Sequence, residues 1–312
     1  MGKKIFKTID EQIDILKGKG LDFTNFNNPG EVLVRENYFF INGYRHLFLT
    51  SASSSHFIPG TNFSELYGLF CFDRQLRNIL FKNIMIIENN VKSIFSYVIS
   101  KNHGYKESTY LDTSMFSKDP KKIKQINDLI KKMKRQIRIN GGQHSATQHY
   151  ISNYGYIPLW VLVKVLSFGI VSEFYQILKE DDRKQIADVY NLTVEDMINY
   201  LPMLANYRNV CAHEDILYEN KTQRTIDNTV YHALLGIRKK DGEYVQGKND
   251  LFALFIILRQ MLSTDDMKNL ISEMSSLLEN LEYNLNTITI DKVLDRMGFP
   301  YNWREIANIE KR

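Results

Sequence analysis

Residues 206–215, with the sequence NYRNVCAHED, place an arginine and a histidine five positions apart. Arg208 would keep its charge and offer a planar fork to a phosphate, whereas His213 could take up or release a proton near neutral pH. Cleavage of RNA without a metal requires a base for the 2′-hydroxyl proton, an acid for the leaving oxygen and a fixed cation for the phosphate. The pair is therefore either a candidate catalytic pair or two structural polar residues that lie close by coincidence.

The spacing limits how these two side chains can act together. Positions five apart on a straight α-helix diverge by about 140°, so Arg208 and His213 can line one edge only near a helix end or across a subunit boundary. Because one helix cannot surround a phosphate with an acid, a base and a cation, we expect a two-fold homodimer in which the motifs face each other. Arg138 and His144 flank a flexible Asn-Gly-Gly break, and we interpret that second pair as accidental.

A basic amphipathic helix is predicted over residues 120–140. Asp119 and Pro120 suit an N-cap and a first turn, and Asn140-Gly141-Gly142 ends the segment. The predicted apolar face consists of Ile123, Ile126, Ile130, Met133 and Ile137. The candidate RNA-binding residues are Lys121, Lys122, Lys124, Lys131, Lys132, Lys134, Arg135 and Arg138.

Three interpretations of this basic helix remain open. Lysine-rich helices are often no more than solvated surface. Contact with anionic lipid is disfavoured because no aromatic residue stands on the apolar face as an anchor. Clustered lysine and arginine on one element is also the usual electrostatic signature of nucleic-acid binding.

The rest of the chain predicts the helices that must position these residues. Thr8 with Glu11 forms a capping-box start, and residues 62–100 predict one long helix or two in near succession. Residues 156–178 form another strongly apolar helical stretch. Thr193 with Asp196 opens the helix that runs into the Arg208–His213 segment. The fold class is therefore all-α.

Two further features complete the helical prediction. Pro202 either kinks the helix that Thr193 opens or starts the next one. A small hairpin at 238–249, with Asp241 and Gly242 in its turn, is the likeliest strand pair.

Composition restricts the class of protein. The net charge of +4 is too small to identify a partner, and two cysteines are too few for a disulfide framework. Cys211, His213, Glu214 and Asp215 are adjacent on a helix and point apart, so we expect no metal site and no cofactor. The start MGKKIFKTIDEQ lacks the apolar stretch of a signal peptide, and the most apolar runs contain Lys164 and Arg259. We expect a cytoplasmic protein without a membrane segment.

Several ordered motifs resemble known families. RNVCAHED resembles the Arg-x4-His signature of HEPN ribonucleases. The chain as a whole resembles the AbiD/AbiF (Abi-2) branch of bacterial abortive-infection proteins. The motifs that carry this resemblance are KTIDEQIDILKGKGL, ENYFFINGYRHLF, GTNFSELYGLFCFDRQLRNIL, IENNVKS, PLWVLVKVLSFGIVSEFYQIL, YRNVCAHEDILY and RMGFPYNW.

The resemblance implies a dimeric, all-helical HEPN fold in which two motifs form one RNA-cutting site. Arg208 and His213 then take the catalytic positions, and Asn209 takes the polar position after the arginine. Glu88 matches an acidic position on the long helix, where it either takes part directly or only orients Arg74 or Arg208. Asp215 stands where HEPN toxins silenced by adenylylation have a tyrosine, so that mode of control is not expected.

The predicted organisation is an N-terminal helical segment (1–60), a HEPN core (61–220) and a C-terminal helical segment (221–312). The resemblance predicts an endoribonuclease that acts as a toxin in antiphage defence and is restrained by a small noncoding RNA. The alternative is a non-cutting RNA-binding module that acts by sequestration. Retention of both Arg208 and His213 favours the enzyme.

Overall fold

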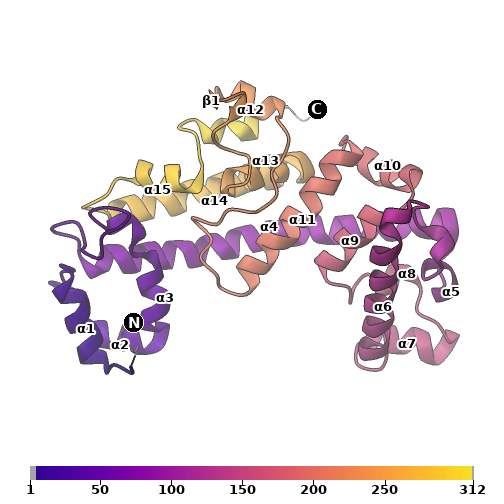
Figure 1. Cartoon of the computed structure of the whole chain (residues 1–312), viewed down its shortest axis with the longest axis horizontal. Coiled ribbons are helices and arrows are strands. Elements are labelled where there is room, and N and C mark those ends of the chain that lie inside the picture. Colours follow the sequence, from indigo (N-terminus) through magenta and orange to yellow (C-terminus); the bar gives the residue numbers. More distant parts are fainter. Residues whose placement is uncertain (1–4, 311–312) are drawn as a thin grey trace.

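The helix α4 organises the molecule. In the computed structural model, which describes residues 5–310, α4 runs without a break from Phe63 to His103. Its 41 residues correspond to a length of about 60 Å. Figure 1 shows α4 along most of the long axis of the molecule. The stretch predicted over 62–100 is thus one helix, and a capping box of Asn62 and Glu65 starts it.

The other helices gather at the two ends of α4 and along its sides (Figure 1). At one end lie α1 (Ile9–Gly18), α2 (Pro29–Glu36), α3 (Tyr38–Asn42) and η1 (Gly43–Phe48). At the other end lie α5 (Glu107–Tyr110), η2 (Thr113–Met115), η3 (Pro120–Lys122), α6 (Ile123–Asn140), α7 (Ser145–Tyr154) and α8 (Leu159–Leu162). The chain returns through α9 (Phe168–Ile177), α10 (Glu180–Asp188) and α11 (Val194–Ala212). The C-terminal part adds α12 (Val230–Leu234), α13 (Leu251–Met261), α14 (Thr264–Tyr283), α15 (Ile290–Met297) and η4 (Trp303–Asn308).

One hydrophobic core joins these elements. Its buried side chains extend from Leu16 in α1 to Ala307 in η4. Every residue of α13 except Gln260 is buried, and the buried Arg259 guanidinium donates to the carbonyl oxygens of Ile306 and Ile309. Within residues 5–310, no helix combines the length and the hydropathy that crossing a bilayer requires. The basic start of the chain, from which the lack of a signal peptide was predicted, lies partly outside these residues.

The predicted all-α class is confirmed. In residues 5–310 the one β-sheet is the two-stranded hairpin of β1 (Lys239–Lys240) and β2 (Glu243–Tyr244). Asp241 and Gly242 form its turn with φ of 52° and 86°, the left-handed conformations that a tight two-residue hairpin turn requires. The capping box predicted at Thr8 and the helix start predicted at Thr193 are both present, and Thr193 also forms a capping box with Asp196.

The sequence predicted one helical stretch over residues 156–178, but the structure has two helices there. α8 ends at Leu162, residues 163–166 form a turn, and α9 starts after Ser167, which is extended and whose side chain accepts a hydrogen bond from the Ile170 N–H. Pro202, by contrast, does not end α11. The proline removes the donor for the Ile198 carbonyl, and the Arg224 side chain donates to that oxygen instead, at 3.3 Å.

Candidate functional site

The Arg208–His213 segment lies at the end of α11. This helix ends at Ala212, and the His213 N–H makes the last helical hydrogen bond, to the Asn209 carbonyl at 2.9 Å. The pair thus occupies a helix end, which is one of the two settings that the five-residue spacing requires. The His213 and Asn209 side chains are exposed, and Arg208 is partly exposed.

A Schellman-type turn closes α11 just after the motif. The Asp215 N–H donates back to the Val210 carbonyl at 3.2 Å, and Glu214 has a φ of 58°. Glycine is the usual residue at this position, and an L-residue with a side chain costs about 1–2 kcal/mol there. The strained residue therefore stands directly beside His213.

Arg208 is anchored at one side of its guanidinium group and open at the other. Its Nε lies 3.4 Å from Oε2 of the buried Glu88, and the guanidinium lies over the Phe81 ring at 5.7 Å from the ring centre. Lys92 donates to the other Glu88 oxygen at 2.7 Å. The Arg208 side chain is 30% exposed, and neither of its two Nη atoms makes a hydrogen bond within residues 5–310. The terminal fork is thus free to meet an anion.

His213 faces a different environment from Arg208. His213 lines a cavity of about 960 Å³ between the α2–α3 region and the segment after α11, whereas Arg208 is not among the lining residues. No hydrogen bond or ion pair joins Arg208 to His213 within the described part of the chain. Glu88 lies beside Arg208 and not beside Arg74, which instead pairs with Glu36. One chain alone therefore does not bring the cation and the histidine together.

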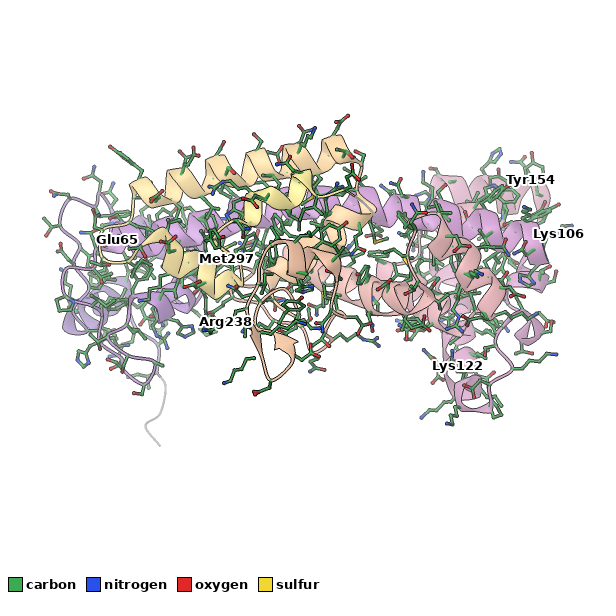
Figure 2. All side chains as sticks on the ribbon, turned by 90° about the horizontal axis from the view of Figure 1, so that it is seen from above. Glu65, Lys106, Lys122, Tyr154, Arg238 and Met297 are labelled. Atoms are coloured by element: carbon green, nitrogen blue, oxygen red, sulfur yellow. The ribbon has the colours of Figure 1, made fainter. Side chains whose placement is uncertain are left out.

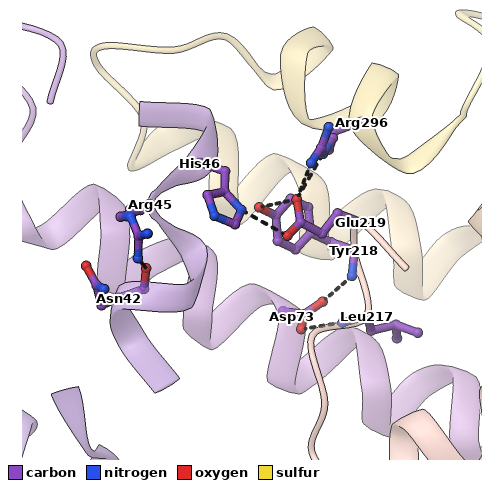
Figure 3. Close-up of polar contacts among 8 residues, drawn as sticks. All are labelled: Asn42, Arg45, His46, Asp73, Leu217, Tyr218, Glu219 and Arg296. Atoms are coloured by element: carbon purple, nitrogen blue, oxygen red, sulfur yellow. Dashed lines mark hydrogen bonds and ion pairs between the residues drawn. The ribbon is translucent and has the colours of Figure 1, made fainter. Parts of the chain in front are cut away.

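A buried carboxylate holds the segment that follows the motif. Asp73 of α4 accepts hydrogen bonds from the backbone N–H groups of Leu217, at 3.0 Å, and Tyr218, at 2.7 Å (Figure 3). The Tyr44 hydroxyl and the Arg77 guanidinium also donate to Asp73, at 2.7 and 2.6 Å. Burial raises the pKa of the Asp73 carboxyl, and these donors oppose that shift. Sequence reasoning missed this group, although Asp73 and Arg77 are charged residues in a strongly apolar stretch.

A second carboxylate ties the same segment to the C-terminal helices. Glu219 accepts hydrogen bonds from Arg296 of α15, at 2.7 Å from Nη2, and lies 3.2 Å from Nδ1 of His46 (Figure 3). These contacts join η1, α15 and the segment after α11. The segment that follows His213 is therefore held by residues from α4, η1 and α15.

The motif, the long helix and the cavity all lie in a region with a recognisable family pattern. A model of the family described as Abi-like protein matches residues 31–219. The chain belongs to the Abi-like protein family. This is the abortive-infection family that the ordered motifs resemble. Comparison with curated proteins and with solved structures gives no match.

The basic helix of this Abi-like protein forms as the sequence predicted. Asp119 caps the short η3 turn, and α6 continues to Asn140. The face that packs inward contains Ile126, Leu129, Ile130 and Met133. Ile123, which the sequence placed on this face, is 56% exposed because it stands in the first turn of α6, before the helix packs on α9.

The cations of α6 lie at one end of the molecule (Figure 1), whereas Arg208 contacts the middle of α4. α6 is at the end of the molecule opposite α1–α3, and Lys122 marks that end in Figure 2. Lys132 pairs with Glu173 at 2.7 Å, and Lys122 donates to the Gln176 carbonyl at 2.8 Å. Lys131 lies 3.7 Å from Asp128. Of the eight candidate RNA-binding residues, those that are exposed and have no carboxylate partner within residues 5–310 are Lys121, Lys124, Lys134, Arg135 and Arg138.

The cysteines and acidic groups of the Abi-like chain do not form a metal site in its described part. No three histidine, cysteine, aspartate or glutamate side chains converge there. Cys71 and Cys211 are free, and burial raises the pKa of Cys211 to about 12. This thiol therefore stays protonated at neutral pH and is a poor nucleophile.

Proposed function

We propose that this Abi-like protein is a metal-independent endoribonuclease of the HEPN type that acts as an abortive-infection effector. The observation that carries the proposal is the state of Arg208. Glu88 holds its Nε side against α4, while its Nη fork is open and lies five residues before an exposed histidine at a helix end. A guanidinium that is held on its Nε side and has a free Nη fork is suited to the negative charge that builds on a phosphate during cleavage.

The proposed reaction uses the RNA itself as the nucleophile. His213 removes the proton from a 2′-hydroxyl, and the 2′-oxygen forms a bond to phosphorus as the bond to the 5′-oxygen breaks. A protonated histidine returns a proton to the leaving oxygen. Arg208 stabilises the charge on the phosphoryl oxygens, and Asn209 offers a neutral donor beside it. The products carry a 2′,3′-cyclic phosphate and a 5′-hydroxyl.

A second copy of the chain completes the proposed site. Within the described part of one chain no hydrogen bond or ion pair joins Arg208 to His213, and one histidine cannot be base and acid for the same bond at the same time. In a two-fold homodimer, each subunit presents the same surface, so two motifs can flank one phosphate. Light scattering measures the mass of the protein in solution and so distinguishes a dimer from a monomer. A monomer at micromolar concentration that still cuts RNA would contradict the composite site.

RNA is both the proposed substrate and the proposed restraint. The exposed cations of α6 are suited to contact a phosphate backbone over a length that the motif alone does not cover. A small noncoding RNA held there would restrain the enzyme without chemical modification of the motif.

The deciding experiment compares RNA ends produced by wild type, His213→Ala and Arg208→Ala. His56→Ala and Arg238→Ala are matched controls, because both residues are exposed and their side chains have no hydrogen-bond or ion-pair partner in residues 5–310. We expect wild type and controls to cut RNA in EDTA, and both motif variants to lose cutting while RNA binding remains. A requirement for a divalent ion, or a 3′-hydroxyl product, would refute the mechanism. Binding without cutting by wild type would favour the alternative, sequestration of RNA.

A further inference from the structure

The cavity beside His213 combines aromatic rings with arginines. Its volume is about 960 Å³, which lies at the upper end of the range of about 300–1,000 Å³ typical of ligand pockets. One wall is formed by His213 and the residues after it, and the other by the α2–α3 region and α4. The cavity is therefore large enough for more than a single ion and opens directly beside the motif.

The aromatic part of the lining is unusually exposed. Phe39 and Phe40 of α3 are 75% and 58% exposed, and their ring centres lie 6.0 Å apart with the rings steeply inclined. Phe70 lines the same cavity. Adjacent exposed phenylalanines on a short helix contribute nothing to the core, and such surfaces are typical of binding sites. Flat apolar rings beside positive charge are suited to the face of an unpaired nucleobase.

The cationic part of the lining contains one arginine without a counter-charge. Arg74 is paired with Glu36 and stacks on Phe70 at 4.7 Å. Arg77 is paired with the buried Asp73. Arg45 donates to the Asn42 carbonyl at 3.1 Å (Figure 3) and has no carboxylate partner in residues 5–310. Arg45 is thus the lining cation best placed to bind a phosphate.

The opposite wall carries the opposite charge. Glu214 and Asp215 line the cavity on the motif side and have no ion-pair partner in the described part of the chain. Carboxylates repel phosphate but accept hydrogen bonds from the amino edge of a base. The wall of the α2–α3 region and α4 thus carries the rings and Arg45, and the wall after α11 carries the two carboxylates. A nucleotide has a group for each of these: the face of its base for the rings, its phosphate for Arg45, and the amino edge of its base for the carboxylates.

We propose that this cavity binds one unpaired nucleotide of a single-stranded RNA, with its base against Phe40 and its phosphate at Arg45, next to the phosphate held at His213. The inference rests on the proposed ribonuclease function for its link to cleavage. It adds a substrate class: RNA that is single-stranded at the cut, because a base in a duplex cannot enter the cavity.

The test uses an RNA that cannot be cut, so that binding is measured apart from chemistry. The probe is a fluorescent 12-nucleotide single strand with 2′-O-methyl groups throughout, and the readout is anisotropy with wild type, Phe40→Ala and Arg45→Gln. Tyr283→Ala is the matched control, since Tyr283 is 90% exposed and distant in sequence from the cavity lining. We expect each cavity variant to bind about tenfold more weakly, the factor typical of one stacked base or one phosphate contact, and the control to bind as wild type.

A duplex version of the same probe provides a second arm. We expect Phe40→Ala to weaken single-strand binding and to leave duplex binding unchanged. Equal affinity of both cavity variants and wild type for the single strand would overturn the inference even if the protein cuts RNA. If wild type does not cut but the losses appear, the ribonuclease proposal fails and the nucleotide site stands. If Phe40→Ala lowers the mass in solution and leaves RNA affinity unchanged, α3 is a contact between copies and the inference is overturned.

Discussion

Replacing Asp73 with asparagine would test whether this carboxylate fixes the segment after the motif. Asp73 is fully buried and accepts four hydrogen bonds, two from the backbone of Leu217 and Tyr218 and two from Tyr44 and Arg77. Asparagine has nearly the same shape but only one oxygen. Whichever way its amide is turned, an N–H group of the new side chain faces a donor that Asp73 had satisfied.

The expected loss of free energy of unfolding is the cost of an unpaired buried charge, reduced by the acceptors that this charge keeps. Removing one partner of a buried ion pair costs about 3–5 kcal/mol, because the other charge is left uncompensated. Arg77 keeps two acceptors that reduce this loss, the Tyr44 hydroxyl and the Asp215 carbonyl, both at 3.2 Å. We therefore expect the lower part of the range, about 3 kcal/mol of the free energy of unfolding. The segment bearing His213 should loosen, so RNA cutting should fall even at temperatures where the variant is folded.

Urea unfolding of four proteins separates the contribution of the Asp73–Arg77 ion pair to stability from that of the other hydrogen bonds of Asp73. They are wild type, Asp73→Asn, Arg77→Met and the double variant. We expect the double variant to lose less free energy of unfolding than the sum of the single losses, by about 1–3 kcal/mol, since removal of both charges leaves neither one buried alone. A loss under 1 kcal/mol for Asp73→Asn, or strictly additive losses, would refute this account of the site.

Three further predictions concern other parts of the chain. Changing Lys131, Lys132, Lys134 and Arg135 together to glutamine should weaken RNA binding and flatten its salt dependence without a change in melting temperature, as titrations at several salt concentrations would show. Burial raises the pKa of Asp250 from 3.8 to about 6, so wild type should lose up to about 3 kcal/mol of stability as the pH rises through this window. Asp250→Asn should lack that loss, and urea unfolding at pH 4 and pH 7 would compare the two. Glu214→Gly should raise the free energy of unfolding by about 1 kcal/mol, whereas Glu214→Ala should not, because only glycine relieves the left-handed strain.

Features that depend on neighbouring residues could be predicted from the sequence. The starts at Thr8 and Thr193, the hairpin turn and the basic helix all follow from side chains within a few positions of the backbone that they cap or bend. The break between α8 and α9 was missed because the apolar pattern continues across it, while one serine changes the backbone. The apolar pattern indicates which residues are buried, but buried residues can belong to one helix or to two.

Features that depend on distant partners could not be predicted in the same way. Two of the partners of Asp73 are the backbone N–H groups of Leu217 and Tyr218, which lie 144 and 145 positions away. The cavity likewise needs α2, α3 and the end of α11 to meet in space. The sequence did contain a local signal, since Asp73 and Arg77 are four positions apart in an apolar helix. A charged pair at that spacing in a buried stretch indicates a satisfied network, but not what it holds.

The α4 residues that contact Arg208 and the segment after His213, with Lys92, lie on one stripe of this helix. Its members are Asp73, Arg77, Phe81, Glu88 and Lys92, which at 100° per residue fall within a sector about 100° wide. Glu88 and Phe81 meet Arg208, while Asp73 and Arg77 hold the backbone just after His213. No hydrogen bond joins the two candidate catalytic side chains within residues 5–310, yet a single continuous helix holds both Arg208 and the backbone just after His213. A movement of the backbone after His213 toward Arg208 would break the hydrogen bonds of Leu217 and Tyr218 to Asp73, and a movement of Arg208 would break its contact with Glu88. This is a further argument for the proposal that a second subunit completes the site, with the stripe on α4 unchanged in both.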